Sequence, residues 1–206
     1  MMMGTIYLVI ASVIWGLVHS LLASHKFKHV LRGSFGSMAF ERLYRLAYNL
    51  FALASLFPIM LMLVTFPDQP LYSIPAPWVY LTTIVQGLAA FALITGVMQT
   101  GPMEFAGLAQ LSPYAIEEQP ARLVTDGLYA YVRHPLYTAG LIFIWFSPEM
   151  TLNRLVLWSI FSIYILIGAY FEERKLLVDF GSEYARYRSM TPMLIPGLLK
   201  TAKRKL

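Results

Sequence analysis

The chain has 206 residues, 58% of them hydrophobic and 13% charged, with a mean hydropathy of +0.60. A soluble domain usually carries about 25% charged residues, so the composition excludes an ordinary soluble protein and indicates a membrane protein. The net charge is +5, but the basic residues lie between hydrophobic stretches, which predicts membrane topology and not nucleic-acid binding. The chain has no cysteine, which excludes disulfides, thiolate metal sites and a cysteine nucleophile.

Five apolar stretches are predicted to cross the bilayer as helices, because about 20 residues of α-helix span about 30 Å of hydrocarbon. The first three run from about residue 5 to 23, 41 to 66 and 78 to 98. The fourth reaches only about residue 146, so we expect a short or tilted span that begins at Pro135. The fifth runs from about residue 152 to 171. Because a short Ser147-Pro148-Glu149 turn separates the last two, they are predicted to form an antiparallel helical hairpin.

The connections between these stretches differ in charge. The first is basic and contains glycines, which predicts a cytoplasmic loop, whereas residues 67–77 hold four prolines and no Lys or Arg, which predicts a short loop on the opposite side. Residues 99–135 form a long polar connection, typical of a functional or disordered segment. This arrangement places 15 of the 16 Lys and Arg residues on one face, so we expect the N-terminus outside and the C-terminus in the cytoplasm.

The segment after residue 171 has apolar residues at helical spacing, which predicts an amphipathic helix against the bundle or the membrane surface. These apolar residues are Leu176, Leu177, Phe180, Tyr184 and Tyr187. The basic residues at the end of the chain are suited to anionic lipid headgroups; they are Lys200, Lys203, Arg204 and Lys205.

Together these elements predict an all-α fold, a polytopic membrane helical bundle of about five transmembrane helices with a C-terminal amphipathic helix. We expect one integral-membrane domain over residues 1–206, with three spans in residues 1–98 and the remainder in 99–206. Such a protein would be a multi-pass protein of a bacterial or archaeal cell membrane. Its expected partners are the lipid bilayer and a small molecule, with no nucleic acid and no obligate protein partner.

Two adjacent carboxylates, Glu172 and Glu173, directly follow the fifth apolar stretch. A buried carboxylate is costly without a partner, so at least one of them is expected to meet a cation. Two interpretations remain open. Both side chains could be solvated at the helix end, with Lys175 nearby, or one could bind the cationic amine of a ligand.

Histidines offer the other candidate chemistry. His134 lies between Arg133 and Pro135, where the simpler interpretation is that Arg133 and His134 reach toward the membrane interface. His19 lies well inside the first apolar stretch beside Trp15, where it is either a structural hydrogen-bonding group or a substrate contact. No metal site is expected. The one suitably spaced histidine pair, His25 and His29, lies among Lys26 and Lys28, whose charges disfavour a metal cation. The tyrosines near His134 could pack in the core or stack on a planar ligand; they are Tyr129, Tyr131 and Tyr137.

Several motifs in the second half of the chain resemble a known family. They are Gly127-Leu128-Tyr129, the run Tyr131-Val132-Arg133-His134-Pro135-Leu136-Tyr137-Thr138-Ala139-Gly140, the pair Glu172-Glu173, and Phe180-Gly181-Ser182-Glu183-Tyr184 with Tyr187 and Pro192. Over about residues 121–196 the chain resembles the integral-membrane methyltransferases related to isoprenylcysteine carboxyl methyltransferase and phospholipid methyltransferase. In the first half, Trp15-Gly16-Leu17-Val18-His19-Ser20 and Tyr44-Arg45-Leu46-Ala47-Tyr48-Asn49 resemble the NnrU branch, to which methanethiol S-methyltransferase is similar.

The resemblance implies a cofactor, S-adenosyl-L-methionine, bound on the cytoplasmic side between the C-terminal spans and the tail, with S-adenosyl-L-homocysteine as product. It implies that Glu172, beside Glu173, receives the methionyl ammonium group. It also implies that the first part of the motif lies along the cofactor and that the segment at Pro135 holds it by backbone and ring contacts. The first part comprises Ala121, Arg122, Leu123, Val124 and Tyr129, and the second His134, Pro135, Leu136 and Tyr137.

One departure from the family concerns the methyl acceptor. Gly168 stands where the carboxyl-methylating branch has an arginine that is thought to meet the substrate carboxylate. This disfavours a prenylcysteine carboxylate as the acceptor. A small thiol, a lipid amine and an isoprenoid-type acid all suit an apolar entry path, and we rank them in that order. His134 or His19 would serve as a catalytic base, and His19 and Trp15 as substrate contacts. A non-catalytic membrane scaffold or regulator and a small transporter are the alternatives from other functional classes.

Overall fold

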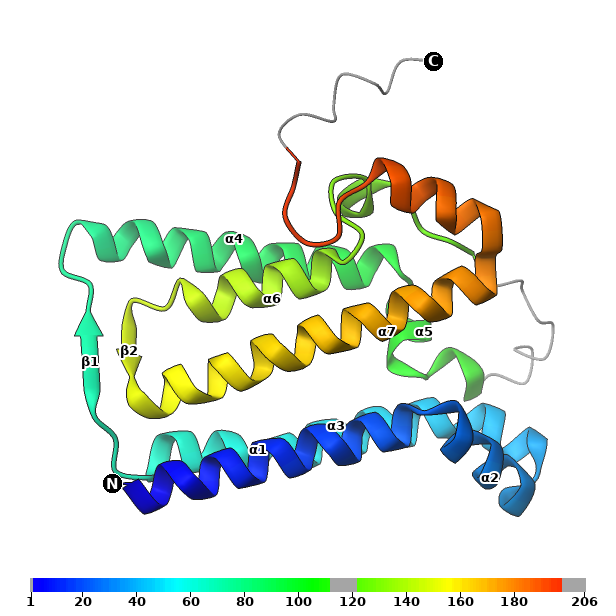
Figure 1. Cartoon of the computed structure of the whole chain (residues 1–206), viewed down its shortest axis with the longest axis horizontal. Coiled ribbons are helices and arrows are strands. Elements are labelled where there is room, and N and C mark those ends of the chain that lie inside the picture. Colours follow the sequence, from blue (N-terminus) through cyan, green and yellow to red (C-terminus); the bar gives the residue numbers. More distant parts are fainter. Residues whose placement is uncertain (1, 112–121, 198–206) are drawn as a thin grey trace. The chain divides into compact units, whose positions relative to one another are not determined.

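The computed structural model describes residues 2–111 and 122–197, which form helices with one pair of short strands (Figure 1). The chain divides into two compact units, each assembled from separate stretches of sequence. Unit 1 comprises residues 1–72, 101–119 and 149–160, and unit 2 comprises residues 73–100, 120–148 and 161–206. Each unit therefore depends on contacts between residues that are far apart in the chain.

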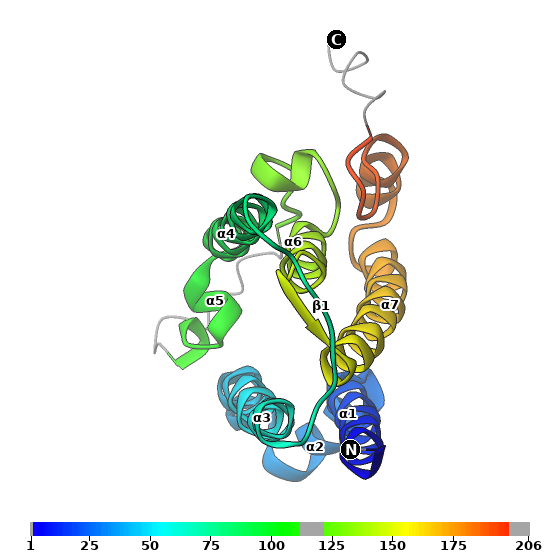
Figure 2. The ribbon, with the colours of Figure 1, turned by 90° about the vertical axis from the view of Figure 1, so that its left-hand side faces the viewer.

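Unit 1 is built on two long helices, α1 (Met2–Ala23) and α3 (Ser37–Thr65), which lie side by side in Figures 1 and 2. The indole Nε1 of Trp15 donates to the hydroxyl of Ser55 across this contact, at 3.0 Å. The short helix α5 (Pro102–Ala106) is attached to α3, because the side-chain amide of Asn49 donates to the carbonyls of Phe105 and Ala106. The predicted polar connection thus begins with ordered helical structure.

The first basic connection is a helix and not the predicted loop. Helix α2 (His25–Phe35) begins at Ser24, whose hydroxyl accepts a hydrogen bond from the backbone N–H of Phe27, as helix-capping serines do. It ends at Gly36, whose φ of +81° falls in a region that favours glycine. A capping serine and a terminal glycine were the signals in the sequence for this helix.

Two short strands are a small exception to the predicted all-α fold. Strand β1 (Pro70–Ser73) pairs with β2 (Glu149–Thr151), which lies between the predicted fourth and fifth spans. The start of the next helix is anchored nearby, since the backbone N–H of Asn153 donates to the Asp68 carboxylate at 3.0 Å. The proline-rich connection therefore holds the beginning of the last long helix.

Unit 2 contains α4 (Trp78–Gln99), α6 (Pro135–Trp145) and most of α7 (Leu152–Met190). Helix α6 begins at Pro135, as predicted, and runs beside α4 (Figures 1 and 2). The contact is close: a Cβ built on Gly96 would lie 2.7 Å from Cδ2 of Leu136. Helices α6 and α7 also interact, because the indole of Trp145 donates to the hydroxyl of Ser162 at 2.8 Å.

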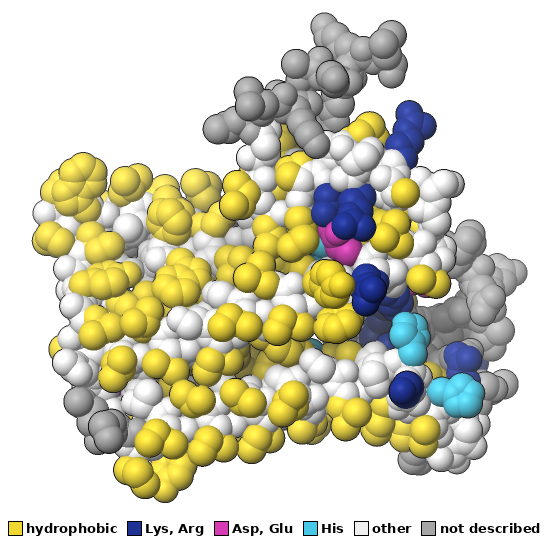
Figure 3. Space-filling model, in the orientation of Figure 1, with side chains coloured by type: hydrophobic (Ala, Val, Ile, Leu, Met, Phe, Trp, Pro, Cys, Tyr) yellow, Lys and Arg dark blue, Asp and Glu magenta, His cyan; other side chains and the backbone are white. Residues whose placement is uncertain are grey.

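Within residues 2–111 and 122–197, four helices are long and apolar enough to cross a membrane, and the chain is a multi-pass membrane protein. Their apolar segments are Met3–Ala23, Arg42–Thr65, Trp78–Gln99 and Leu152–Met190. The predicted fourth span is the apolar helix α6, which has only 11 residues, so four of the five predicted spans are present as long apolar helices. On the face drawn in Figure 3, hydrophobic side chains cover much of the helical surface, as a bilayer requires.

The predicted amphipathic segment forms the last part of α7, where two helices adjoin at a kink. Gly181 interrupts α7 with a φ of +52° and a ψ of −124°, and the chain changes direction there (Figure 1). Beyond this break the side chains of Tyr184 and Tyr187 are buried. The break therefore turns the end of α7 so that its aromatic side faces the rest of unit 2.

Candidate functional site

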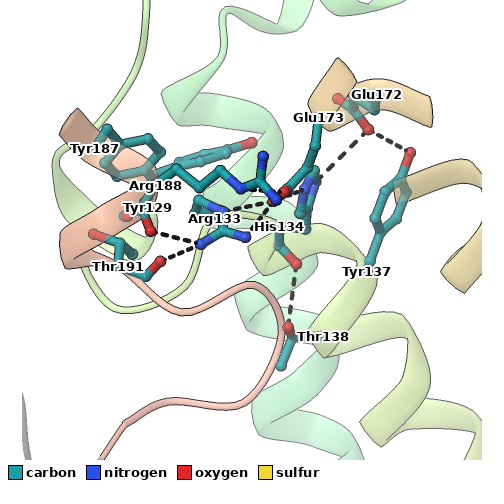
Figure 4. Close-up of polar contacts among 10 residues, drawn as sticks. All are labelled: Tyr129, Arg133, His134, Tyr137, Thr138, Glu172, Glu173, Tyr187, Arg188 and Thr191. Carbon is teal, nitrogen blue, oxygen red and sulfur yellow. Dashed lines mark hydrogen bonds and ion pairs between the residues drawn. The ribbon is translucent and has the colours of Figure 1, made fainter. Parts of the chain in front are cut away.

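Charged and polar side chains from two elements of unit 2 meet where α6 begins. They form the ionic cluster, which consists of Arg133, His134, Tyr137, Glu172, Glu173 and Arg188 (Figure 4). Pro135 occupies the first turn of α6, where its missing N–H and fixed φ are tolerated. The helix start thus sets His134 and Tyr137 one turn apart, facing the carboxylates of α7.

Glu173 is the buried carboxylate of the pair, with a side chain that is 6% exposed. Its Oε1 lies 2.5 Å from Nη2 of Arg133, and its Oε2 lies 3.3 Å from Nε of Arg188. The Nε2 of His134 is 3.3 Å from the same Oε1. The prediction that one glutamate meets a cation is therefore confirmed, but the cations are arginines of the chain itself.

Glu172 has a different environment from its neighbour, because its side chain is 44% exposed. The Tyr137 hydroxyl donates to its Oε2 at 2.8 Å, and Nδ1 of His134 lies 3.7 Å from that oxygen. The rings of His134 and Tyr137 are stacked, with centroids 5.4 Å apart. These contacts fix the direction of a carboxylate that remains accessible to a ligand.

Arg133 is buried as well, which contradicts the interpretation that Arg133 and His134 reach toward the interface. Its side chain is 9% exposed, and His134 is buried beside it. Besides binding Glu173, its Nη1 donates to the carbonyls of Arg188 and Thr191. A buried guanidinium needs several acceptors because its planar head carries five N–H donors.

The segment that follows α7 is bound along the start of α6. The backbone N–H of Arg133 donates to the carbonyl of Pro192 at 2.9 Å, and that of His134 to Met193 at 3.1 Å. The Thr138 hydroxyl donates to the carbonyl of Leu194 at 2.7 Å. Residues 191–194 therefore form an extended edge beside the ionic cluster.

Tyr129 lies in a short 3₁₀ turn, Gly127–Ala130, that precedes the cluster. The hydroxyl of Tyr187 donates to its carbonyl at 2.6 Å, which joins the turn to the end of α7. Burial, together with the negative charge of Glu172, raises the pKa of Tyr129 to about 12. The phenol is therefore neutral at physiological pH, and it lies close enough to Glu172 for the charge of that carboxylate to act on it.

A cavity of about 660 Å³ lies between this turn and the end of α7. Its volume falls in the range of small-molecule and cofactor sites. Tyr131 and Tyr187 supply aromatic surface, and Thr125, Glu183 and Arg186 supply polar groups. Tyr187 and Thr191 belong to the wall of the cavity and also contact the residues around the ionic cluster.

Most of the residues implied by the resemblance lie in this part of unit 2. Leu123 lines the cavity, Arg122 is exposed and Val124 is partly exposed. Leu136 packs against Gly96 of α4, so its side chain is engaged in the helix contact. Ala121 lies outside the described residues.

Sequence reasoning did not select Arg133 and Arg188 as functional residues, or Thr138 and Thr191 as their supports. The signal available for Arg133 was its position next to His134 in the motif. Its partner Glu173 is 40 residues away in the chain, so only the tertiary structure identifies the pair.

A second polar cluster lies inside unit 1. The aromatic cluster consists of Trp15, His19, Tyr48 and Ser55, all from α1 and α3. The rings of Trp15 and His19 stack with centroids 4.8 Å apart, and the Tyr48 hydroxyl lies 2.5 Å from Nε2 of His19. His19 thus has a hydrogen-bonding partner inside an apolar helix pair.

Comparison with known proteins gives both a family and named relatives. Residues 3–191 match the family described as "Protein of unknown function (DUF1295)". The chain is 32% identical over 181 residues to methanethiol S-methyltransferase 1 of Bradyrhizobium diazoefficiens, covering 86% of this chain and 62% of that protein. It is 41% identical over 92 residues to methanethiol S-methyltransferase of Crocosphaera subtropica, covering 44% of this chain and 36% of that protein.

A relative from another branch is also similar. The chain is 43% identical over 83 residues to protein-S-isoprenylcysteine O-methyltransferase of Schizosaccharomyces pombe, covering 36% of this chain and 33% of that protein. The chain thus spans less than two thirds of the length of each of these relatives. No solved structure matches the chain.

Proposed function

This chain belongs to the DUF1295 family, and we propose that it is a membrane methyltransferase that uses S-adenosyl-L-methionine to methylate a small thiol. The observation that carries the proposal is the contrast between Glu172 and Glu173. Both oxygens of Glu173 are occupied by cationic groups of the chain, whereas Glu172 is 44% exposed and oriented by Tyr137. An exposed, oriented carboxylate at the edge of a buried ionic cluster suits the ammonium group of an amino-acid ligand.

The residues around Glu172 fit the remainder of this cofactor. Its nucleoside needs aromatic surface and hydrogen-bonding groups, and the cavity of about 660 Å³ offers both, with Leu123 in its wall. Tyr129 would contact the cofactor between the cavity and the carboxylate, because its phenol lies within the electrostatic reach of Glu172. When bound, the cofactor supplies a methyl group on a positively charged sulfur.

The protein has three tasks in the reaction: to bind the cofactor, to align the acceptor and to exclude water. In such a transfer the thiolate electron pair would form the new bond to the methyl carbon, and the bond from that carbon to the cofactor sulfur would break and leave the sulfur neutral. The thiol proton must leave before or during this step. Both ring nitrogens of His134 face glutamate oxygens, so we assign His134 to holding Glu172.

Support for a thiol acceptor comes from the names of two relatives and from the residue at position 168. Two of the relatives described above are named methanethiol S-methyltransferases. The relative named protein-S-isoprenylcysteine O-methyltransferase supports a second candidate, methylation of an isoprenoid-type carboxylate. Against that candidate, Gly168 supplies no positive charge one turn before Glu172, and a Cβ there would meet nothing within 4 Å. For the acceptor itself we propose His19 and Trp15 as contacts, on the ground that His19 is an ionisable group within an apolar helix.

The orientation in the membrane is part of the same proposal. A cofactor made in the cytosol requires the ionic cluster to face the cytoplasm. The placement of 15 of the 16 Lys and Arg residues on the same side of the predicted topology supports this orientation.

Calorimetric titration with S-adenosyl-L-homocysteine tests the proposal in detergent-purified protein. We expect wild type to bind and Glu172→Gln to bind about 10- to 100-fold more weakly, because a hydrogen bond to a charged group contributes roughly 1.5–3 kcal/mol. Glu149→Gln is the matched control, since the Glu149 side chain is 68% exposed and outside the cluster. Equal affinity in wild type and Glu172→Gln would contradict the site, and transfer of labelled methyl to thiols, amines and acids would rank the acceptors.

A further inference from the structure

The adjacent glutamates of α7 differ in what they can bind. Glu173 has Arg133 and His134 at Oε1 and Arg188 at Oε2, so neither oxygen is free to receive a ligand cation. Removing one partner of a buried ion pair leaves an uncompensated charge, which is strongly unfavourable. Glu173 therefore does not exchange its arginines for a ligand, although the resemblance groups it with Glu172.

Arg133 connects Glu173 to the end of the described chain. Its Nε and Nη2 bind the carboxylate, while Nη1 donates to the carbonyls of Arg188 and Thr191. The last carbonyls of a helix have no partner within the helix, so this guanidinium satisfies the end of α7. A lysine would keep the charge but could not make this forked set of bonds.

The same contacts build a wall of the cavity. Thr191 and Pro192 line the cavity together with Pro196 and Gly197. The carbonyl of Thr191 accepts from the Arg133 guanidinium, and that of Pro192 accepts from the Arg133 backbone N–H. The bonds from His134 to Met193 and from Thr138 to Leu194 continue the attachment. The first residue of this wall, Thr191, is thus held by the Arg133 side chain, which does not itself line the cavity.

We infer that the Arg133–Glu173 ion pair is a positioning device for the ligand site. It holds the start of the cavity wall at Thr191 and balances Glu173, so that Glu172 is the carboxylate left to face the ligand. Neither Arg133 nor Glu173 touches the ligand in this arrangement. The inference rests on the proposed function for the identity of the ligand, but the positioning of the wall can be measured without one.

The chain has no cysteine, so a single introduced cysteine gives a clean site for a spin label. Ile195, which is 82% exposed, reports on the wall, and Val178, which is 84% exposed on α7, is the matched control. We expect Glu173→Gln and Arg133→Lys each to increase the mobility of the label at position 195 and leave the label at 178 unchanged. Both should also lower the affinity for S-adenosyl-L-homocysteine at least about tenfold.

Glu172→Gln separates the two roles, because it should lower ligand affinity and leave the mobility at position 195 unchanged. Thr138→Val removes the hydroxyl that donates to the carbonyls of Leu194 and His134 and should give a smaller increase in mobility, so it keeps the test valid if Glu173→Gln does not fold. Unchanged mobility at position 195 in Arg133→Lys and Thr138→Val would overturn the inference. Failure of wild type to bind the ligand would instead contradict the proposed function, and the label would still report on the wall.

Discussion

The aromatic cluster of unit 1 and the ionic cluster of unit 2 bury polar groups in different ways. The first joins α1 and α3 through uncharged hydrogen-bonding groups, such as the indole of Trp15 and the hydroxyl of Tyr48. The second joins α6, α7 and the segment beyond α7 through charges, with Glu173 at its centre. An unpaired neutral group costs less to bury than an unpaired charge, so the ionic cluster depends far more on each of its members.

The largest expected effect comes from breaking the ionic cluster at its centre. Arg133→Met should reduce the free energy of unfolding by roughly 3–5 kcal/mol, because Glu173 would be left buried beside a neutral side chain. Tyr48→Phe in the aromatic cluster should cost only about 1 kcal/mol, the value of an ordinary hydrogen bond. Denaturant unfolding in detergent compares the two variants. Similar losses of unfolding free energy in the two variants would show that the ionic cluster does not depend more on each of its members than the aromatic cluster does.

The aromatic cluster is expected to act on the acceptor and not on the cofactor. His19→Gln should lower kcat/KM for a small thiol about tenfold, as expected for a hydrogen bond to a reacting group worth about 1.4 kcal/mol, and leave the affinity for S-adenosyl-L-homocysteine unchanged. Steady-state kinetics with calorimetry on the same preparation distinguishes these effects. An equal loss of ligand affinity would mean that His19 stabilises the whole protein and has no specific role toward the thiol.

A smaller effect is expected at the edge of the ionic cluster, where Tyr137 orients Glu172. Tyr137→Phe retains the ring that stacks on His134 but removes the hydroxyl that donates to the carboxylate at 2.8 Å. We expect the affinity for S-adenosyl-L-homocysteine to fall about 3- to 10-fold, consistent with one hydrogen bond of roughly 0.5–1.5 kcal/mol. Tyr80→Phe is the control, since Tyr80 is an exposed aromatic of α4.

The smallest effect concerns the phenol of Tyr129, whose pKa is raised to about 12 by burial and by Glu172. Because the folded pKa lies above the ordinary value of about 10, the neutral phenol is favoured in the folded protein. Its contribution to stability is present below pH 10 and is lost as the pH rises through 12. Glu172→Gln should lower this pKa, as measured by the ultraviolet absorbance difference between Tyr129 and Tyr129→Phe proteins. No change would place Glu172 outside the reach of the phenol.

Hydropathy predicted the long spans because bilayer thickness imposes a length on each helix. The third predicted span, 78–98, differs from α4 (Trp78–Gln99) by one residue, and Pro135 correctly predicted the start of α6. The helix α2 was missed although its sequence carries a capping serine and a terminal glycine. The basic composition of this segment led to the prediction of a loop, whereas the capping residues at its two ends favour a helix.

The candidate site was predicted only where its residues adjoin in sequence. The Arg133-His134-Pro135 motif and the Glu172-Glu173 pair both stood out, but nothing in the sequence indicated which glutamate would be buried. That difference follows from the rotation of α7, which turns Glu173 toward Arg133 and Glu172 toward Tyr137. Successive residues of a helix point about 100° apart, so two identical neighbours acquire different environments from geometry alone.

The break at Gly181 has a consequence for protein engineering. A Cβ at Gly181 would meet nothing within 4 Å, and the same is true of Gly168 in the regular part of α7. Replacing a helical glycine with alanine often adds about 0.5–1 kcal/mol to the free energy of unfolding. Judged only by the space around a new Cβ, both positions would accept alanine. Alanine suits Gly168, but the φ of +52° at Gly181 is a conformation that alanine resists. Alanine at Gly181 would be strained in this conformation, and relief of that strain by straightening α7 would move Tyr187 away from Tyr129 and reshape the cavity.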